Sequence, residues 1–239
     1  MLAASILIFI FLVEATTTVT SPKRNHVVHC IESEKQALLS FKQDLVDPLN
    51  RLTSWDSNGD DCCKWTGIVC DNTTDHVKQL QLANLYDEGA LSGKGEISEA
   101  LDRMIGCNPK RITSLSLDGN FFSGQLKDDI IEKFENLTSF SAYGNMLSGL
   151  IPHSLGKLSA LKYLFIGGNQ FNGSLPESFG SLSALEQLDI YENLLKGVVS
   201  EIHFSNLTNL QVLVAFDNLL TLRMPFSIGS GNYQQVFHT

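Results

Sequence analysis

The sequence is short of basic residues and has no apolar run long enough to span a membrane. Its 239 residues include 17 Lys and Arg against 26 Asp and Glu, which gives a formal net charge of −9 at pH 7. Because a nucleic-acid binder needs an excess of Lys and Arg to neutralise phosphates, this balance excludes that class of partner. The longest apolar run, Leu2 to Val13, falls short of the ~20 residues that cross a bilayer. We therefore expect a membrane link only through a segment absent from this chain.

Motifs for catalysis and metal binding are missing as well. There is no Gly-x-Ser-x-Gly, no His-Glu-x-x-His and no Cys-x-x-Cys, and Gly229-Ser-Gly231 lacks the Lys of a phosphate-binding loop. The six His are scattered, and no carboxylate or nucleophile shares a repeat frame with any of them. We expect neither an enzyme nor a bound metal or cofactor.

Residues 1–20 have the pattern of a signal peptide that is removed on secretion. The apolar run ends at Val13, and the small residues Val13 and Ala15 at alternate positions fit a signal-peptidase site. A buried first strand or helix is the alternative. Four Asn-x-Ser/Thr sequons agree with passage through the secretory pathway. They predict N-glycans at Asn72, Asn136, Asn172 and Asn206.

Five cysteines then lie in an oxidising compartment, where disulfides persist. Four of them cluster early in the chain, namely Cys30, Cys62, Cys63 and Cys70. Adjacent cysteines pair with each other only at a cost in strain, so the two connectivities that send Cys62 and Cys63 to different partners both stay open. Cys107 is left over, and we expect it to be a buried thiol rather than a reactive one.

Residues 33–46 have the pattern of a short helix. Ser33 and Gln36 fit a capping box, apolar residues from Ala37 to Leu45 recur on one face, and the Asp47-Pro48 step is expected to end the helix. Together with the clustered cysteines, this helix predicts a compact N-terminal cap over residues 28–75.

The chain repeats itself from residue 112 onward. An asparagine recurs at intervals of 25, 24, 24 and 25 residues, each time three positions after an apolar-x-apolar step. Five copies share the frame Leu-x-x-Leu-x-Leu-x-x-Asn, with some conservative replacements. The recurring asparagines are Asn120, Asn145, Asn169, Asn193 and Asn218.

Each apolar-x-apolar step predicts a short strand whose alternate side chains point inward. One such unit cannot bury its apolar face alone, so we expect the units to stack into a curved α/β solenoid with a parallel sheet on its concave face. At the turn after each strand, the asparagine side chain can bond backbone groups of its own and the adjacent coil, which predicts a buried ladder. About six repeats are expected over residues 76–228.

The first of these repeats is imperfect. Val77, Leu80 and Leu82 fit the frame, but Leu85 stands at the asparagine position. The next asparagine, Asn120, follows 35 residues later, which implies an insertion around Tyr86 to Ser92. We expect the ladder and the strand register to be weakest there.

The outward residues of the strands line up in columns on the concave face, and aromatics gather toward the C-terminal half. Such rigid amphipathic side chains bind peptides and proteins. Strand propensity alone could also place Tyr and Phe there, or further repeats could cover Phe216. The candidate ligand-binding residues are Tyr143, Tyr163, Phe165, Asp189, Tyr191, Glu192 and Phe216.

With these residues in view, the chain resembles the extracellular part of plant leucine-rich-repeat receptors. The cap sequence from Trp65 to Cys70 is similar to the plant N-terminal repeat cap, and Leu147–Pro152 and Phe171–Pro176 resemble the plant-specific repeat. The stretch 201–208 is similar to receptor-like proteins of the group that includes receptors for a fungal xylanase elicitor. The resemblance implies a leucine-rich-repeat fold and disulfides that join Cys30 to Cys62 and Cys63 to Cys70.

The same resemblance implies a function in recognition. It points to an ectodomain of a cell-surface receptor for plant defence, placed in the apoplast or at the plasma membrane, that binds an extracellular peptide, protein or elicitor on its concave face. It also implies a co-receptor kinase as partner. The alternative is a secreted protein similar to the polygalacturonase inhibitors, although those carry more repeats and a closing cysteine cap.

The chain departs from the family pattern at its C-terminal end. After Asn218 the frame decays into a polar tail, residues 229–239, which we expect to be irregular. We also expect the last strand, Val212 to Phe216, to present an open apolar edge that favours self-association. This ending suggests a truncated receptor.

Overall fold

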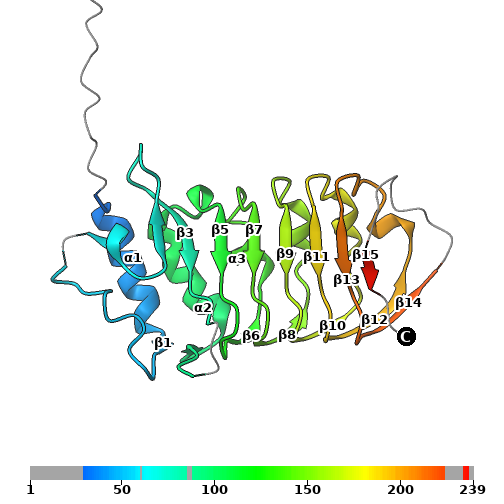
Figure 1. Ribbon diagram of the computed structural model, residues 1–239, viewed down its shortest axis with the longest axis horizontal. Helices are drawn as coiled ribbons and strands as arrows, with labels where there is room; N and C mark the ends of the chain where they lie inside the picture. The colour runs from blue at the N-terminus through cyan, green and yellow to red at the C-terminus, as the bar shows by residue number, and fades with distance from the viewer. Residues whose placement is uncertain (1–28, 60, 85–87, 224–233, 237–239) are drawn as a thin grey trace, which may run out of the picture.

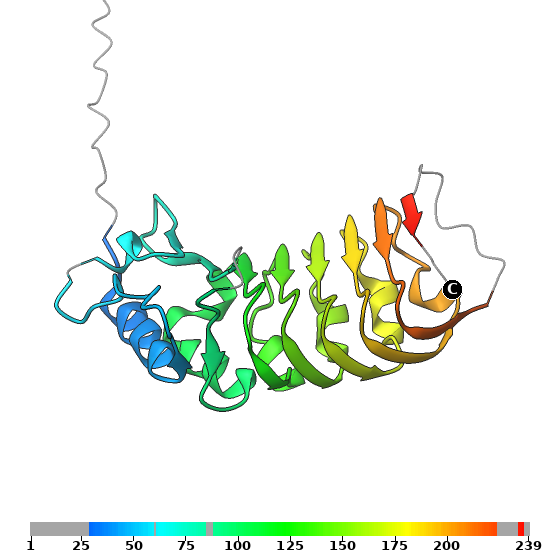
Figure 2. The same cartoon turned by 60° about the horizontal axis from the view of Figure 1, so that its bottom comes forward.

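The computed structural model describes residues 29–59, 61–84, 88–223 and 234–236 of the chain. The predicted signal peptide lies outside these residues, as does Leu85. Figure 1 shows a row of coils stacked side by side behind an N-terminal cap, and Figure 2 shows that the stack is curved with its main sheet on the inner side. The predicted α/β solenoid of the leucine-rich-repeat type is therefore confirmed.

The concave sheet has eight strands in the order β15-β13-β11-β9-β7-β5-β3-β2. All neighbours pair in parallel except β2 and β3, which are antiparallel. The strands are β2 (Ile68–Cys70), β3 (Val77–Gln81), β5 (Ser114–Ser116), β7 (Ser139–Ser141), β9 (Tyr163–Phe165), β11 (Gln187–Asp189), β13 (Val212–Val214) and β15 (Gln234–Val236).

A second parallel sheet has five strands in the order β14-β12-β10-β8-β6. Its strands are β6 (Ser123–Gln125), β8 (Met146–Leu150), β10 (Gln170–Gly173), β12 (Leu194–Val199) and β14 (Leu219–Leu222). A small antiparallel pair joins β1 (Leu45–Val46) to β4 (Ser92–Gly93).

The helices of the described residues are short, apart from the first. The α-helices are α1 (Glu32–Gln43), α2 (Ile97–Asp102) and α3 (Asp128–Ile131). Single 3-10 turns complete the coils at Cys62–Lys64, Arg103–Cys107, Pro109–Arg111, His153–Lys157, Glu177–Ser181 and Glu201–His203. No helix among these residues has the length and hydropathy of a membrane span.

The core consists of the inward residues of the repeat frame. The central residues of the short strands pair in register, so each coil places an apolar side chain directly on that of its neighbour. These stacked residues are Leu80, Leu115, Phe140, Leu164, Leu188 and Leu213, all of which are buried. The stacking explains why strands of three residues persist, since each is buried by the coils on both sides.

The side chains of the repeated asparagines connect neighbouring coils. Asn145 is typical, because its amide donates to the carbonyls of Ala142 (3.1 Å) and Tyr143 (3.2 Å) in its own coil and of Leu117 (3.0 Å) in the preceding one. Its Oδ1 accepts from the backbone of Phe122 at 3.0 Å. Asn169, Asn193 and Asn218 make equivalent bonds to their own and the preceding coils.

The first coil receives a substitute for its missing asparagine. Arg51, in the cap, donates through Nη2 to the carbonyls of Leu82 (3.1 Å) and Ala83 (2.8 Å). These carbonyls stand three and two positions before residue 85, the same offsets at which Asn120 bonds its own coil. The Nη1 of Arg51 also reaches Oδ1 of Asn120 at 3.0 Å. The guanidinium therefore extends the ladder into the cap.

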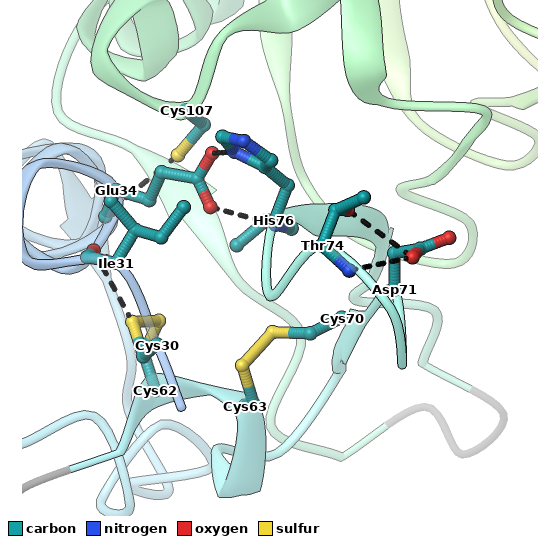
Figure 3. Close-up of polar contacts among 11 residues, drawn as sticks. Cys30, Ile31, Glu34, Cys62, Cys63, Cys70, Asp71, Thr74, His76 and Cys107 are labelled. Atoms are coloured by element: carbon teal, nitrogen blue, oxygen red, sulfur yellow. Dashed lines mark hydrogen bonds and ion pairs between the residues drawn. A yellow bond between two sulfur atoms is a disulfide. The ribbon is translucent and has the colours of Figure 1, made fainter. Parts of the chain in front are cut away.

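The disulfides of the cap are those that the family resemblance implies, Cys30–Cys62 and Cys63–Cys70. Figure 3 shows them beside Glu34, a buried carboxylate of α1 that accepts from the backbone of Val77 and contacts His76 Nδ1, each at 2.7 Å. These bonds attach α1 to the first strand of the repeats. Cys107 is a free, buried thiol, and burial together with the charge of Glu34 raises its pKa.

The predicted limits of the first helix are wrong at both ends. The helix begins at Glu32 after the N-cap Ile31, without a side-chain cap, so Ser33 and Gln36 do not form a capping box. Gln36 instead donates to the carboxylate of Glu32 at 2.7 Å. The helix ends at Gln43, ahead of the Asp47-Pro48 step, because β1 pairs with β4 immediately afterwards.

The expectation of an open edge at the last strand is also wrong. β15 pairs in parallel with β13, with Val212 opposite Gln234 and Val214 opposite Val236. The tail over residues 229–239, expected to be irregular, therefore contributes a strand to the concave sheet. Because the backbone groups of β13 are paired on both sides, that strand does not offer the free edge that self-association would need.

Candidate functional site

The outward residues of the concave sheet change in character along the solenoid. Strand register places Ser114 and Ser139 in line with Tyr163, and Ser116 and Ser141 in line with Phe165. The same rows continue through Gln187 and Asp189 to Val212 and Val214. The N-terminal half of the face is therefore small and polar, whereas the C-terminal half carries aromatic and acidic side chains.

Three aromatic rings form a contiguous patch just beyond the ends of the strands. The ring centroids of Tyr143 and Tyr191 are 5.7 Å apart, and those of Tyr191 and Phe216 are 4.9 Å apart and stacked. The hydroxyl groups of Tyr143 and Tyr191 are hydrogen-bonded to each other. Contact between rings from three coils makes this a built surface rather than a scatter of single exposed aromatics.

Gly167 makes the contact between the two tyrosines possible. It lies in the coil between them, so Tyr143 and Tyr191 reach across a whole repeat to meet. A Cβ atom at position 167 would lie 2.7 Å from Cδ1 of Tyr191 and 2.6 Å from Oδ1 of Asp189. Any side chain there would displace the ring or the carboxylate, because both distances are shorter than van der Waals contact.

The patch borders a shallow hollow of about 340 Å³ on the concave face. This volume is near the lower end of the roughly 300–1,000 Å³ that small-molecule pockets occupy. The hollow has aromatic rings on its sides and a carboxylate from each of two coils. Its lining residues are Asp118, Ser141, Tyr143, Phe165, Asp189 and Tyr191.

The two carboxylates of the hollow are held differently. Asp118 accepts bonds from the backbone of Tyr143 (2.9 Å) and from the hydroxyls of Ser141 and Ser116. Asp189 accepts one bond through Oδ1, from the backbone of Tyr191 at 3.1 Å. Burial raises the pKa of both carboxyls above the usual aspartate value, despite these hydrogen bonds.

The remaining predicted residues lie at the margin of the hollow. Tyr163 stacks loosely on Phe165, at a centroid distance of 6.4 Å, and donates to Oε2 of Glu186 at 2.9 Å. Lys162 donates to the other oxygen of Glu186 at 2.9 Å, so these three residues form a separate polar cluster. Glu192 is exposed in the turn after β11, with a left-handed backbone (φ 48°), and does not line the hollow.

Two residues of the hollow, Asp118 and Ser141, were not among the predicted site residues. The signal for Asp118 is present in the repeat frame, because it occupies the same column as Tyr143, Tyr191 and Phe216. Its place in the lining of the hollow depends on side-chain packing across coils, which the repeat frame does not specify.

The hollow has a mixed aromatic and polar lining. It offers aromatic faces and hydrogen-bond acceptors. Within the described ranges, no group of three or more His, Cys, Asp or Glu side chains is arranged to hold a metal ion.

The four sequon asparagines are all exposed. Asn136 donates to the carbonyl of Lys110 at 2.8 Å, and Asn172 lies within β10 of the second sheet. None of the four stands on the concave strands.

Comparison with known families agrees with the cap and the repeats. The sequence profile described as "Leucine rich repeat N-terminal domain" matches residues 31–71, and the profile "Leucine Rich Repeat" matches residues 136–158 and 160–182. These matches lie in the cap and in two of the repeats, where the chain is similar to leucine-rich-repeat proteins.

The chain is also similar to plant receptors. It is 37% identical over 141 residues to MDIS1-interacting receptor like kinase 1 of Arabidopsis thaliana, and 32% identical over 165 residues to Receptor-like protein EIX1 of Solanum lycopersicum. These matches cover 54% and 56% of the chain. The chain spans only 14% and 16% of the two relatives' own length.

A solved plant ectodomain has the same fold. The Arabidopsis receptor kinase HAESA, whose structure was determined with the peptide hormone IDA and the co-receptor SERK1, superposes with a TM-score of 0.69 at 33% identity. The alignment covers 80% of this chain and 30% of the HAESA chain. The matched part of HAESA is its leucine-rich-repeat ectodomain.

Proposed function

We propose that this chain is the ligand-recognition ectodomain, or a portion of it, of a plant cell-surface receptor-like protein. It binds an extracellular peptide, protein or elicitor on the concave face. The observation that carries this proposal is the contiguous patch of Tyr143, Tyr191 and Phe216 beside the hollow. Large exposed aromatic side chains on a rigid support are the residues on which binding free energy most often concentrates.

The placement of the patch also favours recognition. Short parallel strands, each paired on both sides, hold the rings in fixed positions, so little conformational entropy is lost when a ligand binds. The concave curvature brings several coils within reach of one extended peptide. A secreted, N-glycosylated chain at the cell surface is the setting that fits the signal-peptide pattern, the exposed sequons and the two cap disulfides.

The partners and the signalling role of the chain are proposed by analogy with its relatives. HAESA was solved with the peptide hormone IDA and the co-receptor SERK1, and EIX1 is a receptor-like protein. By analogy, the chain presents a bound peptide to a co-receptor kinase, and defence is the programme that the resemblance to EIX1 favours.

The test uses the mature chain, secreted from plant cells and immobilised, and a phage library of random twelve-residue peptides. We expect selected peptides to lose at least tenfold in affinity when Tyr163 and Tyr191 are both replaced by Ala. Phe121→Ala is the matched control, because Phe121 is an exposed aromatic outside the concave sheet, and it should leave affinity unchanged. Equal binding by the double variant and the parent chain would contradict concave-face recognition.

A further inference from the structure

Within the part of the chain that the structure describes, the hollow brings aromatic rings and carboxylates together without a cation of the protein beside them. Rings of Tyr143, Phe165 and Tyr191 line it, and carboxylates of Asp118 and Asp189 enter it from two different coils. Aromatic faces carry partial negative charge, as the carboxylates carry full negative charge. The hollow is therefore electronegative on several sides while being partly shielded from water.

The protein does not neutralise this charge itself. Among the described residues, the one hydrogen bond made to the Asp189 carboxylate goes to Oδ1, from the backbone of Tyr191. No Lys or Arg occupies the outward columns from Ser114 to Phe216. Lys162, which directly precedes β9, is bonded to Glu186, and neither residue lines the hollow. A positive charge therefore has to come from another molecule.

The geometry keeps Asp189 accessible. Because position 167 is glycine, no side chain stands over Oδ1 of Asp189, where a Cβ would come within 2.6 Å. The tyrosine pair beside it is fixed by its mutual hydrogen bond, and Asp118 is fixed by three donors. The groups that line the hollow are thus preorganised, which favours binding because little reorganisation is needed.

We propose that the hollow takes one cationic side chain, arginine or lysine, of the peptide bound on the concave face. This inference rests on the proposed function and adds the charge of the ligand to it. A guanidinium stacks on aromatic faces while its N–H groups donate to a carboxylate. It can therefore contact the aromatic rings and the carboxylates of the hollow at the same time.

A neutral side chain of the peptide would fit the hollow less well. An aliphatic or phenyl side chain would fill the volume, but it would remove water from Asp118 and Asp189 without giving them a charge or donor in exchange. Desolvating a carboxylate without a partner is strongly unfavourable. Burial raises the pKa of both carboxyls, and a bound cation would act in the opposite direction because it stabilises the ionised form.

The experiment uses two pools of synthetic twelve-residue peptides that differ at one fixed central position. One pool carries arginine there, and the other carries citrulline, its neutral isostere. We expect the immobilised mature chain to bind the arginine pool at least tenfold more tightly. Asp189→Asn should remove most of that preference, whereas Asp217→Asn should preserve it. Asp217 is a matched control because it is an exposed aspartate with a left-handed backbone that asparagine also adopts.

The outcomes separate the two proposals. Binding of both pools that depends on Tyr163 and Tyr191 but shows no preference for arginine would overturn the cation site and leave the proposed function standing. Binding that does not depend on these tyrosines would overturn the proposed function as well. An equal loss of preference in Asp189→Asn and Asp217→Asn would point to general charge attraction and would also overturn the cation site.

Discussion

Each buried asparagine of the repeat supplies hydrogen-bond partners to two coils at once. In the middle of the stack, the amide of Asn169 donates to the carbonyls of Ala142 (2.9 Å), Ile166 (3.2 Å) and Gly167 (3.0 Å). Its Oδ1 accepts from the backbone of Leu147 at 3.0 Å. No apolar residue of the same size can satisfy these groups, which explains why an amide recurs at this position.

Replacing Asn169 with Ala should therefore lower the free energy of unfolding by about 3 kcal/mol, since several buried backbone groups lose their partner. The measurement is urea unfolding followed by circular dichroism. Asn209→Ala is the control, because Asn209 is exposed and makes a single bond, to Ser183 at 2.8 Å. We expect it to cost less than about 0.5 kcal/mol. Similar losses for both variants would contradict the role assigned to the ladder.

Arg51 should be as important to the cap as an asparagine is to a repeat. A lysine at position 51 keeps the charge but cannot donate from two nitrogens to Leu82, Ala83 and Asn120 together. We expect Arg51→Lys to lower the free energy of unfolding by about 2 kcal/mol. Arg103→Lys changes an exposed ion pair with Asp44 and should cost no more than about 0.5 kcal/mol. If the two lysine variants unfold alike, the guanidinium does not extend the ladder.

Protonation of the hollow should control binding of a cationic peptide. Burial raises the pKa of Asp118 and Asp189, so both carboxyls take up protons at a higher pH than an exposed aspartate. Of the other acids nearby, Glu186 is paired with Lys162, which lowers its pKa, and Glu192 lies outside the hollow. Affinity for the arginine pool should fall as pH drops through the raised pKa values, because the protonated carboxyls no longer attract the cation.

The check is a pH series of binding measurements on both pools. Citrulline peptides should show little dependence on pH over the same range, and Asp189→Asn should flatten most of the dependence seen with arginine. If the affinity of both pools declined in parallel, low pH would be acting on the fold or on the whole concave face rather than on the two carboxyls of the hollow.

At the scale of elements, the sequence predicts the strands of the concave sheet well and the other elements poorly. The apolar-x-apolar step recurs in register, so its centre locates β5, β7, β9, β11 and β13. The limits of α1 were wrong because pairing of β1 with β4, a contact to a distant segment, ends the helix. The second sheet was not predicted, since its strands follow from the path of the chain after each asparagine rather than from an alternating pattern.

The second sheet contains an apolar row interrupted by a sequon. Register places Asn172 directly between Leu150 and Leu194, whose side chains are 62% and 56% exposed. A glycan on Asn172 would project over both leucines and shield them from other molecules, because an N-glycan is bulky and strongly hydrated.

We therefore expect Asn172→Gln to make the secreted chain self-associate at concentrations where the parent chain is monomeric, as measured by sedimentation velocity. Asn206→Gln removes a glycan from another exposed sequon and should leave the chain monomeric. If the Asn172→Gln chain stayed monomeric, the exposed Leu150 and Leu194 would not cause self-association even without a glycan, which would contradict this prediction.

At the scale of the whole molecule, the candidate site depends on the stack rather than on any one repeat. The outward columns, and hence most of the aromatic residues, are predictable from the repeat frame. The contact between Tyr143 and Tyr191 is not predictable from the frame. It joins side chains 48 positions apart, and it depends on the glycine at position 167 of the repeat between them. The inclusion of Asp118 is hidden for the same reason.

Within the described residues, the outermost strands of the concave sheet are β2 and β15. At the N-terminal end, β2 pairs antiparallel with β3 and belongs to the disulfide-bonded cap, and at the other end β15 pairs with β13.

The most direct test of this account is to locate a bound peptide by photo-crosslinking. An arginine-pool peptide carrying a benzophenone group next to the arginine is irradiated with the mature chain, and the cross-linked residues are identified by mass spectrometry. The account predicts cross-links to the concave positions between Tyr143 and Phe216, and their loss in the Tyr163→Ala, Tyr191→Ala variant. Cross-links concentrated on the five-stranded sheet or on the cap would contradict it.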